Sequence, residues 1–216
     1  MVAPFQQRNL AINTELVKKE EIASYRDLLN PKWKGKIVFD DPTVGGPGSM
    51  AFRVMAFQTM SLDFLREMVK QDIIITRDRR LAVDWISKGR YSLGIGLDTQ
   101  VLRTFKNAGA PVLMFDAREG EHITSGGGNL YIFKDTPNPN ARRVFINWFL
   151  SREGQTVFSQ AVMEQSARED IPISHLEPWM VRQPGLTYFN AIEEEWQSAQ
   201  GKHLLVAKEI FAPLLK

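Results

Sequence analysis

The sequence lacks cysteine altogether and contains few histidines. With no cysteine among 216 residues, disulfide bonds, thiolate metal sites and cysteine nucleophiles are excluded. The three histidines, His122, His175 and His203, are far apart, and none lies four residues from another potential zinc ligand, which argues against a zinc site. The G-x-S-x-G and H-E-x-x-H patterns of common hydrolases are also absent. The motifs therefore indicate no enzyme class, metal or cofactor.

Long apolar runs and an excess of one charge are missing as well. No apolar run approaches the ~20 residues that span a bilayer. The 27 basic and 25 acidic side chains give a net charge of +2, too small for the basic field of a nucleic-acid-binding protein. The first residues, "MVAPFQQRNLAINTELV", lack a charged segment followed by an apolar core, so they predict no secretion signal. The composition, 44% hydrophobic and 24% charged, is typical of a globular domain.

Between Ile37 and Phe115 the pattern alternates between strands and helices. Short apolar runs predict buried strands, and amphipathic segments follow each of them. This order is typical of βαβ units on a largely parallel sheet. A further helix is predicted over residues 20–30, ending before Pro31. The expected strands are "KIVFDD", "IIIT", "YSLGIGLD" and "PVLMFD". Between them, residues 49–71 predict one helix or a broken pair of helices, and residues 77–86 and 99–109 predict one helix each, the last closed by Gly109.

The character of the sequence changes after Phe115. Three glycines precede "NLYIFK", which predicts a strand where two backbones approach closely. Two amphipathic helices are predicted in "NPNARRVFINWFLSREGQTVFSQ", with Asn140 as N-cap and Gly154 between them. Residues 165–183 have an irregular, proline-containing sequence, and a last helix covers residues 201–216. The chain is thus α/β first and mostly helical afterwards.

The glycine-rich loop "PTVGGPGS" follows a predicted strand and precedes a predicted helix. Such a loop can direct successive backbone N–H groups and a helix N-terminus at an anion, with Thr43 or Ser49 adding a hydroxyl. It lacks the ending of a P-loop and the G-x-G-x-x-G of a dinucleotide site. The alternative is a plain strand-to-helix turn with Ser49 as the N-cap.

Two further loops are expected at the same edge of the sheet. "TRDRR" carries Arg77, Arg79 and Arg80 at a strand-to-helix junction, and "LDTQ" follows the next strand. Because ligands of open α/β sheets bind at the carboxyl ends of strands, the three loops should share one rim. The alternative for the arginines is a solvated helix start, which the helix dipole disfavours. The acids at Asp40–Asp41 and Glu193–Glu195 suit either acid–base chemistry or ordinary solvated charge.

Three stretches resemble a known family: "YRDLLNPKWKGKIVFDDPTVGGPGSMAF", "WISKGRYSLGIGLD" and "NPNARRVFINWFLSREGQTVFSQ". They are similar to extracellular solute-binding proteins of ABC transporters, most of all the ferric-iron-binding type, whose relatives bind phosphonates, thiamine and polyamines. The resemblance covers most of Ile12 to Gln160. It implies an α/β fold: one lobe of the type II periplasmic-binding-protein fold, with a mixed, mostly parallel sheet and flanking helices, plus a C-terminal helical segment of the other lobe.

The resemblance also implies domain boundaries. Residues 1–12 would form a crossing strand, 13–121 the α/β lobe two, 122–136 the return hinge strand, and 137–216 a mainly helical part of lobe one whose last helix returns to lobe two. Family members carry a signal peptide and about a third of the mature chain ahead of the matched region, so we expect this sequence to be a fragment. The helices after Pro137 would then expose apolar faces, which favours a homodimer or strand exchange.

At the position of the tandem tyrosines that bind iron in ferric-binding members, this sequence has Thr99 and Gln100 after Asp98. Their hydrogen-bonding side chains favour an organic solute over Fe(III). The expected activity is capture of a small organic anion (a carboxylate, phosphonate or phosphorylated compound) at a cleft between the two lobes, followed by its delivery to an ABC permease. The resemblance implies that this occurs in the periplasm or elsewhere outside the cytoplasm, without catalysis or cofactor. The alternatives are a metal–anion complex held without tyrosines, an enzyme using Asp98 and Arg79, or a sensory lobe. The predicted ligand-binding residues are Thr43, Gly45, Gly46, Gly48, Ser49, Arg79, Arg80, Asp98, Thr99 and Gln100.

Overall fold

A computed structural model describes residues 5–124 and 130–215 of the chain, which divides into two compact units. The α/β unit contains Gln7–His122, Leu186–Phe189 and the residues from Glu193 onward. The helical unit contains Ile123–Gly185, Asn190–Ile192 and the N-terminal residues up to Gln6. The chain therefore passes between the units five times, and three of these crossings lie within strands. These strands are β1 (Phe5–Gln7), β7 (Glu121–Thr124) and β8 (Tyr188–Asn190), which form one sheet in the order β1-β7-β8.

A five-stranded mixed sheet forms the centre of the α/β unit, in the order β4-β3-β5-β2-β6. β3 pairs in parallel with both β4 and β5, whereas β2 runs antiparallel to β5 and β6. The βαβ pattern predicted the parallel half. β2, which precedes the βαβ units in the sequence, lies between β5 and β6 and runs antiparallel to both. The strands are β2 (Leu10–Asn13), β3 (Ile37–Asp40), β4 (Ile74–Thr76), β5 (Leu93–Ile95) and β6 (Val112–Phe115).

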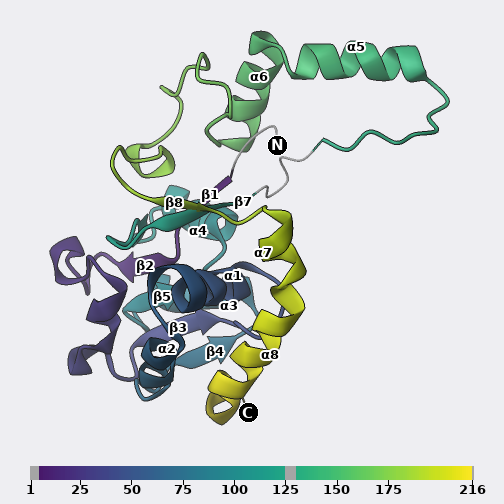
Figure 1. The fold of residues 1–216 in the computed structure, drawn as a ribbon. Coiled ribbons are helices and arrows are strands. Elements are labelled where there is room, and N and C mark those ends of the chain that lie inside the picture. The colour runs from purple at the N-terminus through teal and green to yellow at the C-terminus, as the bar shows by residue number, and fades with distance from the viewer. Residues whose placement is uncertain (1–4, 125–129, 216) are drawn as a thin grey trace. The chain divides into compact units, whose positions relative to one another are not determined.

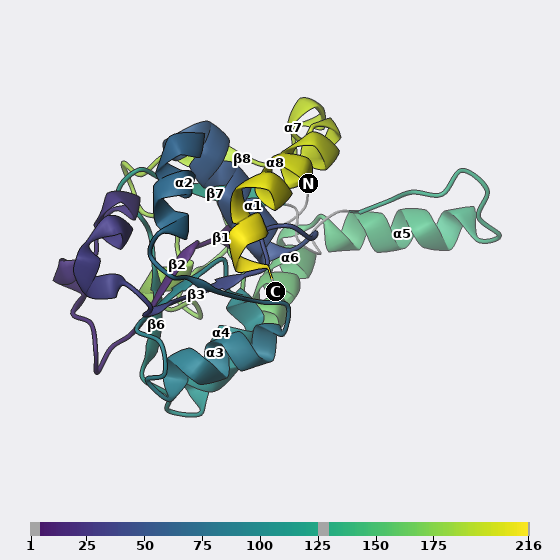
Figure 2. The same cartoon turned by 90° about the horizontal axis from the view of Figure 1, so that it is seen from below.

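Helices cover both faces of this sheet (Figures 1 and 2). The predicted helix over residues 49–71 is a broken pair, α1 (Pro47–Val54) and α2 (Leu62–Val69), joined by a π-helical turn. With α8 (Gln200–Phe211) they cover one face, and α3 (Arg79–Ser87) and α4 (Thr99–Asn107) cover the other. Gly109 ends the α4 region with φ +88°, a left-handed conformation that suits glycine.

The core of the α/β unit joins the C-terminal helix to the first βα segment. The Phe211 ring of α8 packs edge-on against Phe39 of β3 and Phe52 of α1, with centroid distances of 5.6 and 6.1 Å. All three side chains are fully buried. At the other end of α8, the buried Arg53 donates from Nε to His203 Nδ1 at 3.1 Å. The segment after Glu193 is thus part of the α/β unit although it is about 150 residues away from α1 in sequence.

A buried polar network holds the end of β1 to β7. Both oxygens of the Glu121 carboxylate accept hydrogen bonds: Oε2 from Asn9 Nδ2 at 2.8 Å and Oε1 from the Ala117 amide at 3.0 Å. Burial raises the pKa of Glu121 well above its usual value. The network fixes the two connecting strands at the point where they enter the α/β unit.

The helical unit departs from the prediction at three points. Leu130–Lys134 is not a strand and is largely exposed, because it has no neighbouring strand; the strand lies earlier, at β7, and the glycines before Leu130 fall outside the described residues. α5 (Pro139–Phe149) is preceded by Asn138, so Asn140 is not its N-cap. Gly154 lies inside α6 (Arg152–Val162) rather than between the helices, where a Cβ would meet the Trp148 carbonyl oxygen at 2.2 Å.

Two predictions within the α/β unit were also wrong in detail. The helix expected over residues 20–30 is a pair of 3₁₀ turns, Lys19–Glu21 and Tyr25–Leu29, which Ser24 separates by capping the second. β4 is not buried: Ile74 is 39% exposed, because β4 lies at the edge of the sheet. Among the described residues, none of the helices is both long and apolar enough to cross a bilayer.

Candidate functional site

Three loops meet at the carboxyl edge of the parallel strands, as the sequence predicted. Arg79, the first residue of α3, extends over the glycine loop that follows β3, so that a Cβ on Gly46 would lie 2.6 Å from its Nη2 atom. Its Nη1 atom lies 3.6 Å from Asp98 Oδ2, at the start of α4. The Arg79 side chain is 44% exposed. We call the group of Asp40, Gly46, Arg79 and Asp98 the rim cluster.

The glycine loop has two close backbone approaches. Gly46, the N-cap of α1, has φ 157° and ψ −169°, which residues with a Cβ rarely adopt. Gly48 packs so tightly on the end of β3 that a Cβ would lie 2.0 Å from the carbonyl oxygen of Asp40. Gly45 is exposed at the tip of the loop. Gly46 and Gly48 are therefore required by the conformation of the strand-to-helix turn itself.

Some amides expected to face an anion already have acceptors within the chain. The Gly48 amide donates to Asp40 Oδ2 at 2.9 Å, and the Gly46 amide donates to Ser49 Oγ at 3.1 Å. Ser49 in turn donates from Oγ to the Gly46 carbonyl at 2.9 Å. The Ser49 hydroxyl thus closes the first turn of α1, although Gly46 and not Ser49 is the N-cap. The predicted use of Gly46, Gly48 and Ser49 as free donors does not fit this hydrogen bonding.

Thr43 and Arg77 stabilise the start of the loop through hydrogen bonds to the Asp41 carboxylate. The Thr43 amide and hydroxyl both donate to Asp41 Oδ1, at 2.8 and 2.6 Å. Arg77 donates from Nε to Asp41 Oδ2 at 2.7 Å, and this bond together with those from Thr43 lowers the pKa of Asp41 despite its burial. Thr43 is itself buried. The negative charge of Asp41 is therefore balanced by Arg77, and its carboxylate holds the loop in place. The Thr43 hydroxyl is used in this network and does not point to the rim.

At the start of α4, Asp98 has two functions. Its Oδ1 atom accepts from the amides of Gln100 and Val101 at 3.0 and 3.1 Å, which makes it the N-cap of α4, while Oδ2 faces Arg79. Thr99 is buried and its hydroxyl accepts from Gln7 Nε2 at 3.1 Å. Gln100 is exposed and contacts Arg103. Of these three predicted site residues, only Asp98 lies in the rim cluster.

Arg80 does not accompany Arg79. Its guanidinium lies 5.4 Å from the centre of the Phe105 ring, between α3 and α4. Consecutive helical residues diverge by about 100°, so one arginine of the pair faces the rim and the other faces the neighbouring helix. The sequence predicted both as alternatives and could not choose between them.

From the sequence, Asp40 was identified only as one of a pair of acids, and it was not among the predicted ligand-binding residues. It is 4% exposed, and burial raises its pKa from 3.8 to about 6, opposed by the Gly48 amide and Arg79. A carboxylate at the end of a central strand, immediately before a glycine loop, was the signal that could have identified it. Among the described residues, no group of histidine, aspartate and glutamate side chains is arranged to hold a metal ion.

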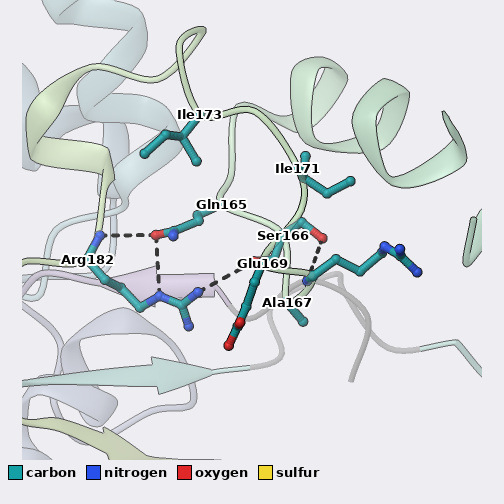
Figure 3. Close-up of a pocket in the computed structure, with 8 residues that line it drawn as sticks. Gln165, Ser166, Ala167, Glu169, Ile171, Ile173 and Arg182 are labelled. Atoms are coloured by element: carbon teal, nitrogen blue, oxygen red, sulfur yellow. Dashed lines mark hydrogen bonds between the residues drawn. The ribbon is translucent and has the colours of Figure 1, made fainter. Parts of the chain in front are cut away.

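A separate cavity of about 250 Å³ lies in the helical unit (Figure 3). Arg182 reaches across it and donates to Gln165 Oε1 at 3.3 Å and, more weakly, to the Ser166 carbonyl at 3.5 Å. The wall also includes the apolar side chains of Ile171 and Ile173. Nothing in the irregular sequence of residues 165–183 predicted this cavity, because it depends on how that segment folds back on itself.

Residues 2–172 match a family model described as a bacterial extracellular solute-binding protein. The chain belongs to this family. A curated relative, an uncharacterized protein of Haemophilus influenzae, is 28% identical over 152 residues. The match covers 67% of this chain but only 43% of that protein, so this solute-binding chain corresponds to less than half of its relative's length.

Several solved structures similar to this solute-binding chain are periplasmic binding proteins or substrate-binding proteins of ABC transporters. Another is a two-component signal-transduction protein, with a TM-score of 0.59 at 22% identity over 82% of this chain and 65% of its own. The protein AfuA from Actinobacillus pleuropneumoniae, with fructose-6-phosphate bound, gives a TM-score of 0.62 at 20% identity and covers 99% of this chain and 67% of its own. The Trichodesmium protein FutA, with iron and citrate, gives 0.71 at 18% identity over 97% and 69%. These similarities confirm the mixed α/β fold of type II periplasmic binding proteins.

Proposed function

We propose that the chain is the ligand-capturing part of the solute-binding component of an ABC importer, and that the rim cluster binds the acid group of a small organic anion. The observation that carries this proposal is the position of Arg79. Its guanidinium is partly exposed and lies where three strand-to-helix loops converge, between Gly46 and Asp98. A carboxylate, phosphonate or phosphate at this point would form charge-assisted hydrogen bonds with it. The solute would be captured outside the cytoplasm and then delivered to the permease of the importer.

The hydrogen bonds inside the glycine loop assign different roles to its residues. Asp40 and Ser49 fix the loop and the first turn of α1, and the loop supports Arg79. The positive end of α1 adds a favourable field for an anion near Gly46. In this proposal Arg79 is the principal anion-binding group, and the amide of the exposed Gly45 is a further donor to the solute. The solute is bound without covalent chemistry.

Two alternatives have less support. A metal–anion complex would need hard oxygen ligands, but Tyr91 is buried, with its ring 5.5 Å from that of Trp85. An enzyme would need a nucleophile or a general base beside Arg79. The Asp98 carboxylate is the nearest group, and one of its oxygens is used as the N-cap of α4.

The test is calorimetric titration of the 216-residue chain with a panel of carboxylates and alkylphosphonates. Arg79→Ala removes charge-assisted bonds worth about 1.5–3 kcal/mol, so affinity should fall at least tenfold. Gly46→Val should weaken binding similarly, since its side chain would displace Arg79 and strain the backbone. Arg80→Ala is the matched control and should change affinity less than twofold. Equal binding by wild type and the Arg79 variant would show that the site lies elsewhere.

We also propose that a second copy of the chain covers the exposed apolar side of α5. On this helix Val144 is 70% exposed, Phe145 52% and Trp148 40%. Stacking of Phe145 on Phe149 makes this surface continuous, with a centroid distance of 5.6 Å. Contiguous apolar surface of this kind is typical of an interface.

A further inference from the structure

The rim cluster contains more acidic than basic side chains. Asp40 and Asp98 both interact with Arg79, so that two carboxylates share one guanidinium. The neighbouring Asp41 does not alter this balance, because Arg77 neutralises it. A site built for a simple anion would be expected to contain an excess of positive charge.

Each of the two carboxylates has an oxygen without a short hydrogen bond. Asp40 Oδ2 accepts from the Gly48 amide, and within the described residues no hydrogen bond reaches Oδ1. Oδ1 is not one of the fully buried polar atoms that lack a partner, so it keeps contact with solvent although the residue as a whole is largely buried. Asp98 Oδ2 lies 3.6 Å from Arg79 Nη1, which is longer than a hydrogen bond, and its side chain is 22% exposed. Both oxygens are therefore acceptors that a hydrogen-bond donor of a bound solute can reach.

We infer that the rim takes an anion that also carries an ammonium group, in which the acid group binds Arg79 and the ammonium binds Asp40 and Asp98. This inference rests on the proposed function and adds to it the substrate class, a small zwitterion. A plain anion would compete with both carboxylates for Arg79 and would lie close to two like charges. An amino-bearing anion matches both signs of charge, and its N–H groups can donate to the accessible oxygens of Asp40 and Asp98.

An amino-bearing anion and a plain anion should change the protonation of Asp40 in opposite directions when they bind. Burial raises the pKa of Asp40 to about 6, and the charged groups that face it are Arg79, Asp41 and Asp98. An ammonium bound beside Asp40 favours the ionised carboxylate, so binding near pH 6 should release protons, and affinity should rise between pH 5 and 7. A plain anion favours the protonated form, so its binding should take up protons and weaken over the same range. The two ligand classes therefore give opposite signs.

The experiment uses two matched series of probes with the 216-residue chain. One contains β-alanine, 3-hydroxypropionate and propionate, and the other contains 2-aminoethyl-, 2-hydroxyethyl- and ethylphosphonate. Calorimetry in two buffers of different ionisation enthalpy measures affinity and proton exchange together. We expect the amino member to bind at least tenfold more tightly than the unsubstituted one in both series. Proton release at pH 6 is read in the carboxylate series, whose acid groups are already ionised at that pH, whereas a phosphonate itself titrates near it.

Variants then test the two carboxylates separately. Asp98→Asn retains an N-cap side chain for α4, and Asp40→Asn retains an acceptor for the Gly48 amide, so both should fold. Each should reduce the preference for the amino member to about twofold or less. Asp63→Asn is the matched control, since it removes an exposed charge from the first turn of α2, and the preference should stay unchanged.

The outcomes separate this inference from the proposed function. If the three members of a series bind equally, or the hydroxyl or unsubstituted member binds best, and Arg79→Ala abolishes that binding, the proposed function stands and the zwitterion inference is overturned. If the amino preference survives in both aspartate variants, the inference is also wrong. If no member of either series binds, acid recognition at the rim fails, and the inference fails with it.

Discussion

Replacement of Gly48 by alanine tests the packing that creates the rim. Gly48 is the second residue of α1, and its φ is compatible with any residue, so helix propensity alone predicts a gain of about 0.4–1 kcal/mol. The tertiary structure predicts the opposite. A Cβ would lie 2.0 Å from the Asp40 carbonyl oxygen and 2.5 Å from its carbonyl carbon, both of which are backbone atoms.

The expected loss can be estimated from two effects. Separating α1 from the end of β3 costs about 1–3 kcal/mol, as overpacked core substitutions do. The same shift lengthens the bond from the Gly48 amide to Asp40, a charge-assisted bond worth about 1.5–3 kcal/mol. α1 has little room to move toward the end of β5, because the backbone of Gly96 lies so close to Gly48 that even a Cβ built on Gly96 would be 2.7 Å from Gly48 Cα. After subtraction of the helix gain, the variant should lose about 2–5 kcal/mol of unfolding free energy.

The assay is urea denaturation followed by circular dichroism. Gly201→Ala is the matched control, because Gly201 is also the second residue of a helix, α8, and nothing lies within 4 Å of a Cβ built there. It should be neutral or stabilising by up to about 1 kcal/mol. If Gly48→Ala is as stable as wild type, the close contact between α1 and β3 is not real, and the position of the loop under Arg79 is wrong.

Two further predictions concern iron and self-association. Because Thr99 and Gln100 stand where ferric-binding members have the tyrosine pair, addition of Fe(III) with an anion should give no tyrosinate-to-iron absorption band; a coloured complex of defined stoichiometry would contradict this. Because the apolar side of α5 is exposed, light scattering should give a molar mass above 24.6 kDa that rises with concentration, and Phe145→Glu should reduce it whereas Arg143→Glu, on the same helix, should not. A monodisperse wild-type monomer at all concentrations would refute the proposed second copy.

Much of the α/β unit could be predicted from the sequence because local patterns determine it. Alternating apolar strands and amphipathic helices located β3 to β6 and α1 to α4, and the order of strands and helices placed three loops at one edge of the sheet. The family resemblance rested on contiguous motifs and was confirmed by the family match. Prediction was weaker after Phe115, where "NLYIFK" has the composition of a strand but no partner strand beside it.

The tertiary structure determined which side chains and backbone amides are available at the rim. The sequence could not show that Asp40 and Ser49 occupy the Gly48 and Gly46 amides, that Thr43 turns toward Asp41, or that Arg80 lies on Phe105. These choices depend on contacts between segments and on side-chain direction, which residue types alone do not fix. The charge of the rim follows from the same contacts. The sequence identified the loops that converge, and the packing determined which of their side chains are available to a solute.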